Sequence, residues 1–313
     1  MTLRHDARGQ AAVLTVVFLT VLLGMVALVL DVGSWYREQR ATQSTADAAA
    51  LAAAQALPES PADARVLANE YVAKNGGGER EITFSSRVLP SDTVTVRVER
   101  DAPGVFAKLF GISSVNVGAK AAARATGLDA ARWVAPIVVN IKHPKLNCAT
   151  DAQGRPVPCY GDPTELELEH MHKPGSGDAA GSFGLINLDT GDTGSAGAST
   201  LGTWIARGFD QYMELGKYNS VPSAMFNDSH IKEALDYRLN DTLLFPIYNK
   251  ITGSGSGAEY VIVGWVGFTV TNFVATGSTS KVFGSFTQTI WEGIQSQSGA
   301  NLNFGARAIA LVN

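Results

Sequence analysis

The sequence predicts an α+β protein with a long N-terminal transmembrane and stem helix, a small α/β module and a mostly-β extracytoplasmic head domain. Three observations predict this class. An apolar run occupies residues 11–30, and an alanine-rich stretch continues from it to residue 57. Beyond residue 133, short runs rich in Val, Ile, Phe and Thr alternate with glycine-rich loops, as expected for strands and turns. The predicted segments are a tail at 1–10, a transmembrane helix at 11–30, a stem helix at 31–57, a module at 58–127 and the β-rich domain at 128–313.

The composition excludes several classes of protein. The 313 residues carry 25 Lys and Arg against 29 Asp and Glu, a net charge of −4, which excludes a strongly basic nucleic-acid binder and predicts no nucleic-acid partner. A hydrophobic content of 45% excludes a disordered chain. The presence of only two cysteines excludes a disulfide-dense miniprotein and a cysteine-rich zinc module.

The apolar run has the length of a membrane span. Of its 20 residues 17 are hydrophobic and none is charged, and at about 1.5 Å per residue they cross a hydrocarbon core of about 30 Å. A buried core helix and a cleavable signal peptide are the two alternatives. A signal peptide has a shorter apolar region that ends at a small-x-small site, whereas the Ala-x-Ala sites here lie at 46–56. We therefore predict an uncleaved anchor, represented by Ala11, Leu14, Phe18, Leu22 and Leu30.

The charges that flank the anchor set its predicted orientation only weakly. Arg4 and Arg8 precede the anchor, and Arg37 and Arg40 follow it beside two acidic residues. The positive-inside rule then favours a cytoplasmic N-terminus by a small margin. The tail before the anchor is too short for a domain, so we expect the working part to lie outside the cytoplasm.

The helix is predicted to continue beyond the membrane. Gly33 is the single helix breaker between the anchor and Pro58, and eight of the eleven residues at 46–56 are alanine, the best helix former. A helix from about residue 10 to 57 would be about 70 Å long. Two interpretations of the alanines stay open: a helix with one face on a domain, or close helix–helix packing in an assembly.

The N-terminal segment resembles a known family. The run Arg-Gly-Gln at 8–10, the apolar span, Asp-Val-Gly at 31–33 and the run from Gln43 to Ala52 keep the order and spacing of the signature of Flp/Tad pilus-assembly TadE/TadG-like proteins. The signature residues are Gly9, Gln10, Asp31, Gly33, Ala46, Asp47, Ala48, Ala49 and Leu51. The resemblance implies a single-pass protein of the bacterial plasma (inner) membrane that takes part in tight-adherence pilus assembly. Its implied partners are the lipid bilayer and other assembly or envelope proteins, such as TadE-like proteins or pilin.

One residue departs from the pilin-like branch of that family. Pilins and the TadE branch carry a prepilin peptidase site, in which Glu is the fifth residue after a Gly, but the fifth residue after Gly9 is Leu14. Leucine cannot supply the charge that pairs with a neighbouring subunit's amino terminus. We therefore expect no prepilin-type cleavage and a TadG-like protein. The Asp-x-Ser-x-Ser metal motif of longer TadG proteins is absent from the sequence.

Residues 58–127 predict a small module packed against the stem. Ser60 caps a helix from Ala62 to Lys74, with an apolar face of Val66, Leu67, Tyr71 and Val72. The triple glycine at 76–78 ends this helix. Strands are predicted at Glu81–Val88 and Thr93–Arg100 around a turn at 89–92, followed by alternation at Val115–Ala125. Between the second strand and this alternating segment, a short helix is predicted at Pro103–Phe110, with Phe106, Leu109 and Phe110 facing inward.

The C-terminal region predicts many strands and two short helices. Twenty of the 32 glycines lie between residues 175 and 305, as expected for many turns. Helices are predicted at Thr200–Phe209 with Ser199 as the cap, and at His230–Leu239 with Ser229 as the cap. Trp265, Phe268 and Phe273 alternate within a strand, which favours core packing. The predicted strands are Trp133–Ile141, Thr164–His170, Phe183–Leu188, Thr242–Ile251, Tyr260–Val274, Val282–Ile290 and Phe304–Val312.

The candidate chemical groups have structural alternatives. Cys148 and Cys159 close a turn-rich loop and predict a disulfide outside the cytoplasm, with free thiols as the alternative. Neighbouring histidines, His143, His170 and His172, match no zinc spacing. Glu165, Glu167 and Glu169 share one strand face, which is either a solvated acidic face or a metal or acid–base site. Asn187, Asp189 and Asp192 form either Asx turns or a Ca²⁺ loop without EF-hand spacing.

The sequence thus favours a non-enzymatic structural or assembly component of a Flp/Tad-type pilus, with no cofactor. The glycine–serine run at 253–257 has the spacing of neither a phosphate loop nor a nucleophile elbow, and no spacing supports a catalytic triad. The alternatives are a membrane-tethered ligand- or Ca²⁺-binding sensor and, third, a tethered hydrolase. The very short tail argues against a sensor that signals alone.

Overall fold

The computed structural model describes residues 7–150, 154–168, 182–189, 196–253, 258–276, 280–298 and 304–312. It has a long N-terminal helix and a mostly-β C-terminal region, which confirms the α+β class. The chain divides into two compact units. The N-terminal unit is Met1–Arg124 with Leu311–Asn313, and the C-terminal unit is Ala125–Ala310. Each unit is described by itself.

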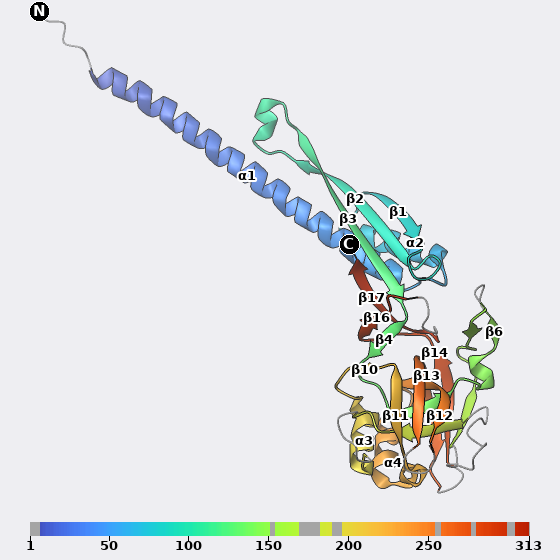
Figure 1. Cartoon of the computed structure of the whole chain (residues 1–313). Coiled ribbons are helices and arrows are strands. Elements are labelled where there is room, and N and C mark those ends of the chain that lie inside the picture. Colours follow the sequence, from blue (N-terminus) through green and yellow to red (C-terminus); the bar gives the residue numbers. More distant parts are fainter. Residues whose placement is uncertain are drawn as a thin grey trace, which may run out of the picture. The chain divides into compact units, whose positions relative to one another are not determined.

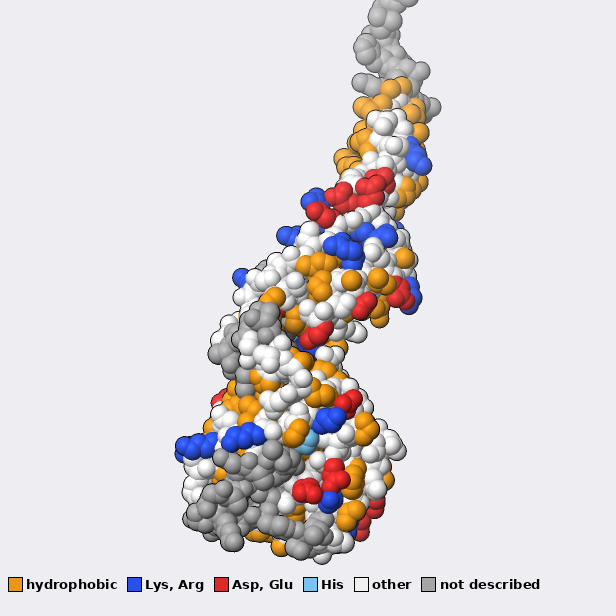
Figure 2. Space-filling model, turned by 90° about the vertical axis from the view of Figure 1, so that its right-hand side faces the viewer, with side chains coloured by type: hydrophobic (Ala, Val, Ile, Leu, Met, Phe, Trp, Pro, Cys, Tyr) orange, Lys and Arg blue, Asp and Glu red, His pale blue; other side chains and the backbone are white. Residues whose placement is uncertain are grey.

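Helix α1, Ala7–Ala54, is continuous over 48 residues, which corresponds to about 72 Å. Its side chains from residue 11 to 30 are exposed apart from a half-exposed Ala27. Figure 2 shows hydrophobic side chains along the visible face of this part of the helix. Among the described residues it is the one helix long and apolar enough to cross a membrane. The helix ends three residues before the predicted end, where i→i−3 hydrogen bonds tighten the chain at 55–57.

The rest of the N-terminal unit is a second helix and an antiparallel sheet in the order β1-β2-β3. Strand β2 pairs with β3 over eleven residue pairs, and Figure 1 shows this long hairpin lying beside α1. Residues 104–113, which we name the hairpin tip, join the two strands and include the 3-10 turn η1. The elements are α2 Pro61–Lys74, β1 Glu79–Ser85, β2 Thr93–Pro103, η1 Ala107–Phe110 and β3 Ser114–Thr126.

Helix α2 is capped as predicted but buries a different face. The Ser60 hydroxyl accepts a hydrogen bond from the Asp63 amide at 3.2 Å. The buried residues are Ala64, Ala68 and Val72, whereas the side chain of Val66 is exposed. The predicted face is right for Val72 and wrong for Val66 and Tyr71, because α2 packs against the alanine-rich part of α1. Two helices that approach closely leave room only for small side chains between them.

The prediction that a short helix at 103–110 turns its large apolar side chains inward is also wrong. Strands β2 and β3 extend to Pro103 and Ser114, which leaves only η1 at the tip of a hairpin. A tip has no second layer to cover it. Accordingly Phe106, Leu109 and Phe110 point outward rather than into a core.

A buried carboxylate shapes the turn between β1 and β2. Asp92 accepts hydrogen bonds from the backbone amides of Arg87, Val88 and Leu89 and from the Thr93 hydroxyl, at 2.7–3.0 Å. Burial raises the pKa of Asp92, but these four bonds outweigh it and hold the pKa below its ordinary value. The turn is therefore wider than the predicted four residues, and β1 ends at Ser85.

The C-terminal unit is built around a sheet that closes on itself. Its strand order is β11-β13-β12-β5-β9-β8-β14, and β14 also pairs with β13 while β11 also pairs with β9. Three further strands pair in the order β10-β4-β16, and β15 pairs in parallel with β17. The strands are β4 Leu128–Ala131, β5 Ile137–Asn140, β6 Ala149–Thr150, β7 Pro156–Val157, β8 Thr164–Leu168, β9 Ser182–Ile186, β10 Met213–Glu214, β11 Gly216–Val221, β12 Thr242–Thr252, β13 Glu259–Val274, β14 Lys281–Thr287, β15 Thr289–Ile290, β16 Gly293–Gln295 and β17 Ala306–Val312.

Two helices pack together on this sheet, and their caps differ from the predicted ones. Helix α3 is Ala198–Arg207 with Gly197 as its N-cap, and α4 is Ser229–Tyr237 with Asp228 as its N-cap. The Asp228 carboxylate accepts the His230 amide at 2.9 Å, which a Ser229 cap cannot do from inside the first turn. Short 3-10 turns occur at η2 Pro144–Leu146 and η3 Ser223–Asn227.

Aromatic residues fill the core of the C-terminal unit. Trp265 and Phe268 are buried, as predicted, and Phe273 is half-buried and packs against the core.

Several glycines lie inside strands rather than in the predicted turns. A Cβ on Gly184 would overlap the Tyr260 hydroxyl, and one on Gly284 would overlap the Thr269 carbonyl oxygen. Glycine at these positions lets a large ring or a neighbouring strand lie directly on the backbone.

Gly284→Ala is expected to destabilise the C-terminal unit, because its Cβ would also lie 2.6 Å from the Phe268 ring. An overpacked core costs about 1–3 kcal/mol, so the melting temperature should fall by roughly 3–10 °C. Calorimetry of the full chain in detergent measures this shift. Gly127→Ala is the control, since nothing lies within 4 Å of its Cβ. Equal melting temperatures for the two variants would contradict this account.

Candidate functional site

The two described acidic residues of the predicted strand face, Glu165 and Glu167, lie on a solvated surface. On β8, Glu165 and Glu167 point outward while Thr164, Leu166 and Leu168 are buried. Lys281 on the neighbouring strand β14 pairs with both carboxylates, with Glu167 at 3.0 Å. Glu169 lies outside the described residues. The lysine offsets part of the negative charge of the face, so the observed arrangement is an ion-paired strand surface.

The described part of the candidate Ca²⁺ loop contains an Asx turn. The Asn187 side-chain oxygen accepts the Asp189 amide at 3.0 Å, which is the turn chemistry weighed against calcium. Asp192 lies outside the described residues. Among the residues that the structure describes, no group of three or more His, Cys, Asp or Glu could hold a metal ion.

Cys148 and Cys159 form the predicted disulfide, with Cα atoms 5.5 Å apart. Nearby, His143 is buried, and its ring nitrogens face the Lys145 amide at 3.1 Å and the Glu165 carbonyl at 3.3 Å. Burial lowers the pKa of His143, so the ring is neutral near pH 7. His170 and His172 lie outside the described residues. The histidine and the disulfide therefore hold the chain around η2.

The signature residues point instead to the junction between α1 and the hairpin. The Asp31 side chain is only 1% exposed, although it directly follows the apolar span. Its carboxylate accepts the backbone amides of Val105, Phe106 and Ala107 at 2.9, 3.0 and 2.5 Å. Three amide donors satisfy a buried carboxylate, as at a helix N-terminus. Asp31 thus fixes the hairpin tip to the end of the span.

Further side chains on the same face of α1 continue this attachment. They recur every four residues after Asp31, which keeps them on one helix face while each step advances about 6 Å along the axis. The ring or amide nitrogens of Trp35, Gln39 and Gln43 donate to the carbonyl oxygens of Pro103, Gly118 and Lys120 at 3.3, 2.7 and 3.3 Å. The hairpin therefore runs along α1 toward the membrane span.

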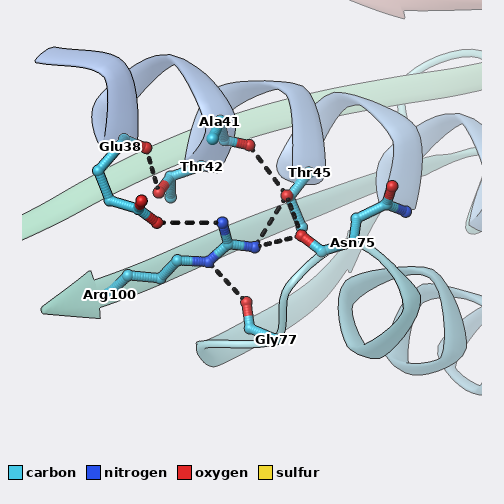
Figure 3. Close-up of polar contacts among 7 residues, drawn as sticks. All are labelled: Glu38, Ala41, Thr42, Thr45, Asn75, Gly77 and Arg100. Carbon is cyan, nitrogen blue, oxygen red and sulfur yellow. Dashed lines mark hydrogen bonds and ion pairs between the residues drawn. The ribbon is translucent and has the colours of Figure 1, made fainter. Parts of the chain in front are cut away.

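Arg100 is the polar centre of the junction (Figure 3). Its side chain is 11% exposed and lies 3.4 Å from the Glu38 carboxylate. It also donates to the Thr45 hydroxyl at 2.9 Å and to the carbonyl oxygens of Asn75 and Gly77 at 2.6 and 2.8 Å. One guanidinium thus joins α1, β2 and the loop after α2. A fixed planar fork of donors suits such a node better than a lysine ammonium.

The triple glycine that ends α2 makes this geometry possible. Gly76, Gly77 and Gly78 all have positive φ, a conformation that other residues rarely adopt. A Cβ on Gly78 would lie 2.8 Å from the Glu99 carbonyl oxygen. The loop can therefore turn its carbonyl groups toward Arg100 and still lie against β2.

The alanines of α1 form the apolar part of the junction. Ala46, Ala49, Ala50, Ala53 and Ala54 are fully buried inside the N-terminal unit. This is the first of the two sequence interpretations, a helix with one face on a domain. It also means that the stem is embedded in the module along its alanine-rich part.

The remaining signature residues are more exposed. Asp47 accepts the Gln43 side-chain amide at 2.7 Å, Ala48 and Leu51 are half-buried, and Gly33 lies on the open side of α1. Gly9 and Gln10 belong to α1, but their side chains lie outside the described residues. All five anchor residues are exposed: Ala11, Leu14, Phe18, Leu22 and Leu30.

The signature did not include Arg100 or Glu38, and Thr45 lies in its run from Gln43 to Ala52 without being one of the residues singled out. A signal for Arg100 was nevertheless present in the sequence. Alternate residues of β2 from Val94 to Val98 and then Ala102 are buried, and Arg100 occupies the same face of the strand. An arginine on the buried side of an alternating strand requires partners, but its partners are distant in sequence and could not be named.

In the described residues these features define one helix long and apolar enough to span a membrane, which continues without a break into a folded module. The comparison with known families agrees. Residues 9–56 match the family model of Flp pilus-assembly TadE/G-like proteins, so this part of the chain carries a TadE/G-like domain, as the sequence resemblance indicated. The match covers α1 almost from end to end. No curated protein and no solved structure matches the chain.

Arg100→Met is expected to destabilise the N-terminal unit by about 2–4 kcal/mol, because it removes the ion-pair partner of Glu38 and the donor of the Gly77 carbonyl group, and leaves the Asn75 carbonyl group with the Thr45 hydroxyl alone. Hydrogen exchange of α2 and β2 amides in the detergent-solubilised full chain measures the loss. Arg97→Met on the same strand is the matched control. The Arg97 side chain is 58% exposed in a surface ion pair, so its loss should cost less than about 1 kcal/mol. Similar losses in both variants would refute the special role of Arg100.

Proposed function

We propose that the chain is a single-pass, membrane-anchored structural component of a Flp/Tad-type pilus assembly system and that it performs no catalytic step. The match of residues 9–56 to the TadE/G-like family carries the pilus context. The exposed apolar surface of α1 supports the anchor, since only a lipid environment covers such a surface without a protein partner. The polar candidates in the described part of the chain form ion pairs, turns and caps, which supports a structural role.

We also propose that the protein belongs to the TadG-like branch and keeps its N-terminus. Leu14 stands where a pilin-like protein has Glu, so the residue that would pair with a neighbouring subunit in a filament is missing. The attachment of the module beside the span supports the same proposal. A permanent anchor needs its helix joined firmly to the folded part, and Asp31 and Arg100 supply that attachment.

The proposed orientation places the N-terminus in the cytoplasm and both units outside it. The charge pattern favours this orientation. The disulfide between Cys148 and Cys159 supports it, because structural disulfides persist in oxidising compartments outside the cytoplasm. In this orientation the C-terminal unit offers its surface to other pilus or envelope components.

Deletion of the gene in its native bacterium tests the pilus function. We expect loss of surface pili, counted by electron microscopy, and restoration by the full chain. A second complementing chain should carry residues 31–313 behind a cleavable signal peptide, and we expect it to be released from the membrane and to fail. Unchanged pili in the deletion strain would refute the pilus role. Full restoration by the released chain would refute the need for an anchor.

The mass of the N-terminal peptide from membrane-purified protein tests the branch. We expect a peptide that begins at or directly after Met1, because no prepilin peptidase site is present. A new terminus at Gln10 would show pilin-like processing and would contradict the TadG-like proposal. A terminus near Trp35 would contradict the anchor itself, since the apolar run would then be a removed signal peptide.

A further inference from the structure

The hairpin tip exposes apolar side chains at the level where the membrane span ends. Leu109 is 83% exposed and Phe110 is 79% exposed, more than any large apolar side chain of the span itself. Val105 and Ile112 are exposed beside them. Scattered single apolar residues on a surface are ordinary, but a cluster of them on one small loop marks a surface that another phase or molecule covers.

The position of the tip relative to α1 identifies that phase. The Asp31 carboxylate binds the tip amides from Val105 to Ala107, and Asp31 is the first residue after the apolar run. Because the hairpin approaches from the Gln43 end of α1, the part of the tip beyond these amides lies farther toward the span. Ala27, one turn before Asp31, is the one half-exposed side chain in an otherwise exposed stretch, and η1 contacts α1.

We propose that the hairpin tip inserts its apolar side chains into the surface of the lipid bilayer beside α1, as a second membrane contact of the same unit. This inference rests on α1 being the membrane span of the proposed function. Its chemistry suits the interface between headgroups and hydrocarbon, where apolar side chains enter while a nearby basic residue reaches the phosphates. Lys108 lies between these apolar residues and is exposed.

The backbone of the tip suits contact with lipid. A loop in contact with hydrocarbon must satisfy its amide groups internally, because no water is available there. The amides of 105–107 donate to Asp31, and those of Gly104, Leu109, Gly111 and Ile112 donate to carbonyl oxygens of the tip itself at 2.9–3.1 Å. The tip therefore presents apolar side chains on a backbone whose donors are largely occupied.

Spin labels on single introduced cysteines test the proposal in the full chain. Both native cysteines are joined in the disulfide, so a thiol-specific label used without reductant reacts only at the new position. Purified protein is reconstituted into phosphatidylethanolamine–phosphatidylglycerol vesicles. Accessibility to oxygen, which concentrates in lipid, is compared with accessibility to a water-soluble nickel chelate. The variants are Leu109→Cys and Phe110→Cys at the tip, Val21→Cys in the span and Val66→Cys on α2.

Val66 is the matched control, because it is an exposed apolar residue of the same unit outside the tip. We expect the ratio of oxygen to nickel accessibility at both tip positions to approach that at Val21 and to exceed that at Val66 several-fold. All the substituted side chains are exposed, so their replacement removes no core packing.

Three results would overturn the inference. Tip labels that behave like the Val66 label place the tip in water. Tip labels shielded from both reagents place it against protein, which in these vesicles is a second copy of the chain. In both of these cases a lipid-exposed Val21 label leaves the anchor intact. A water-exposed Val21 label overturns the anchor together with the inference.

Discussion

The N-terminal unit depends on two ionised side chains that lose most of their water and regain partners only when the hairpin lies along α1. Asp31 receives three backbone amides of the hairpin tip, and Arg100 joins Glu38, Thr45 and the glycine loop after α2. A buried charge without partners is costly, so these two groups disfavour any arrangement in which the hairpin leaves α1. A tilt of α1 in the membrane would then be transmitted directly to the sheet.

The C-terminal unit obeys a different constraint, the closure of a sheet on itself. Closure removes unpaired strand edges, which are sites of unwanted pairing between chains. Gly184 and Gly284 let aromatic side chains and neighbouring strands approach closely enough for this, and the disulfide and His143 secure the chain around η2. Lys281 forms ion pairs with both described carboxylates on the acidic face of β8.

The sequence predicted helix positions and strand alternation well, and it predicted packing faces less well. Ser60 and the strand at Thr93 were located because caps and alternation are local signals. Val66 and Leu109 were placed inward because they are apolar, yet α2 buries Ala64, Ala68 and Val72 instead of Val66, and the tip of a hairpin has no core to enter. Apolar character predicts that a side chain will be covered, but the covering surface is decided elsewhere in the chain.

By itself, the sequence determined the α+β class, the single candidate span, the alanine-rich helix after it and the resemblance to TadE/TadG-like proteins. These depend on local quantities: the length of an apolar run against the thickness of a bilayer, helix propensity, and motif spacing. Only the tertiary structure decided that Asp31 holds the hairpin tip, that Arg100 gathers three segments and that the strands of the C-terminal unit close. Each of these joins residues far apart in the chain, and their pairing depends on the whole packed arrangement rather than on any local pattern.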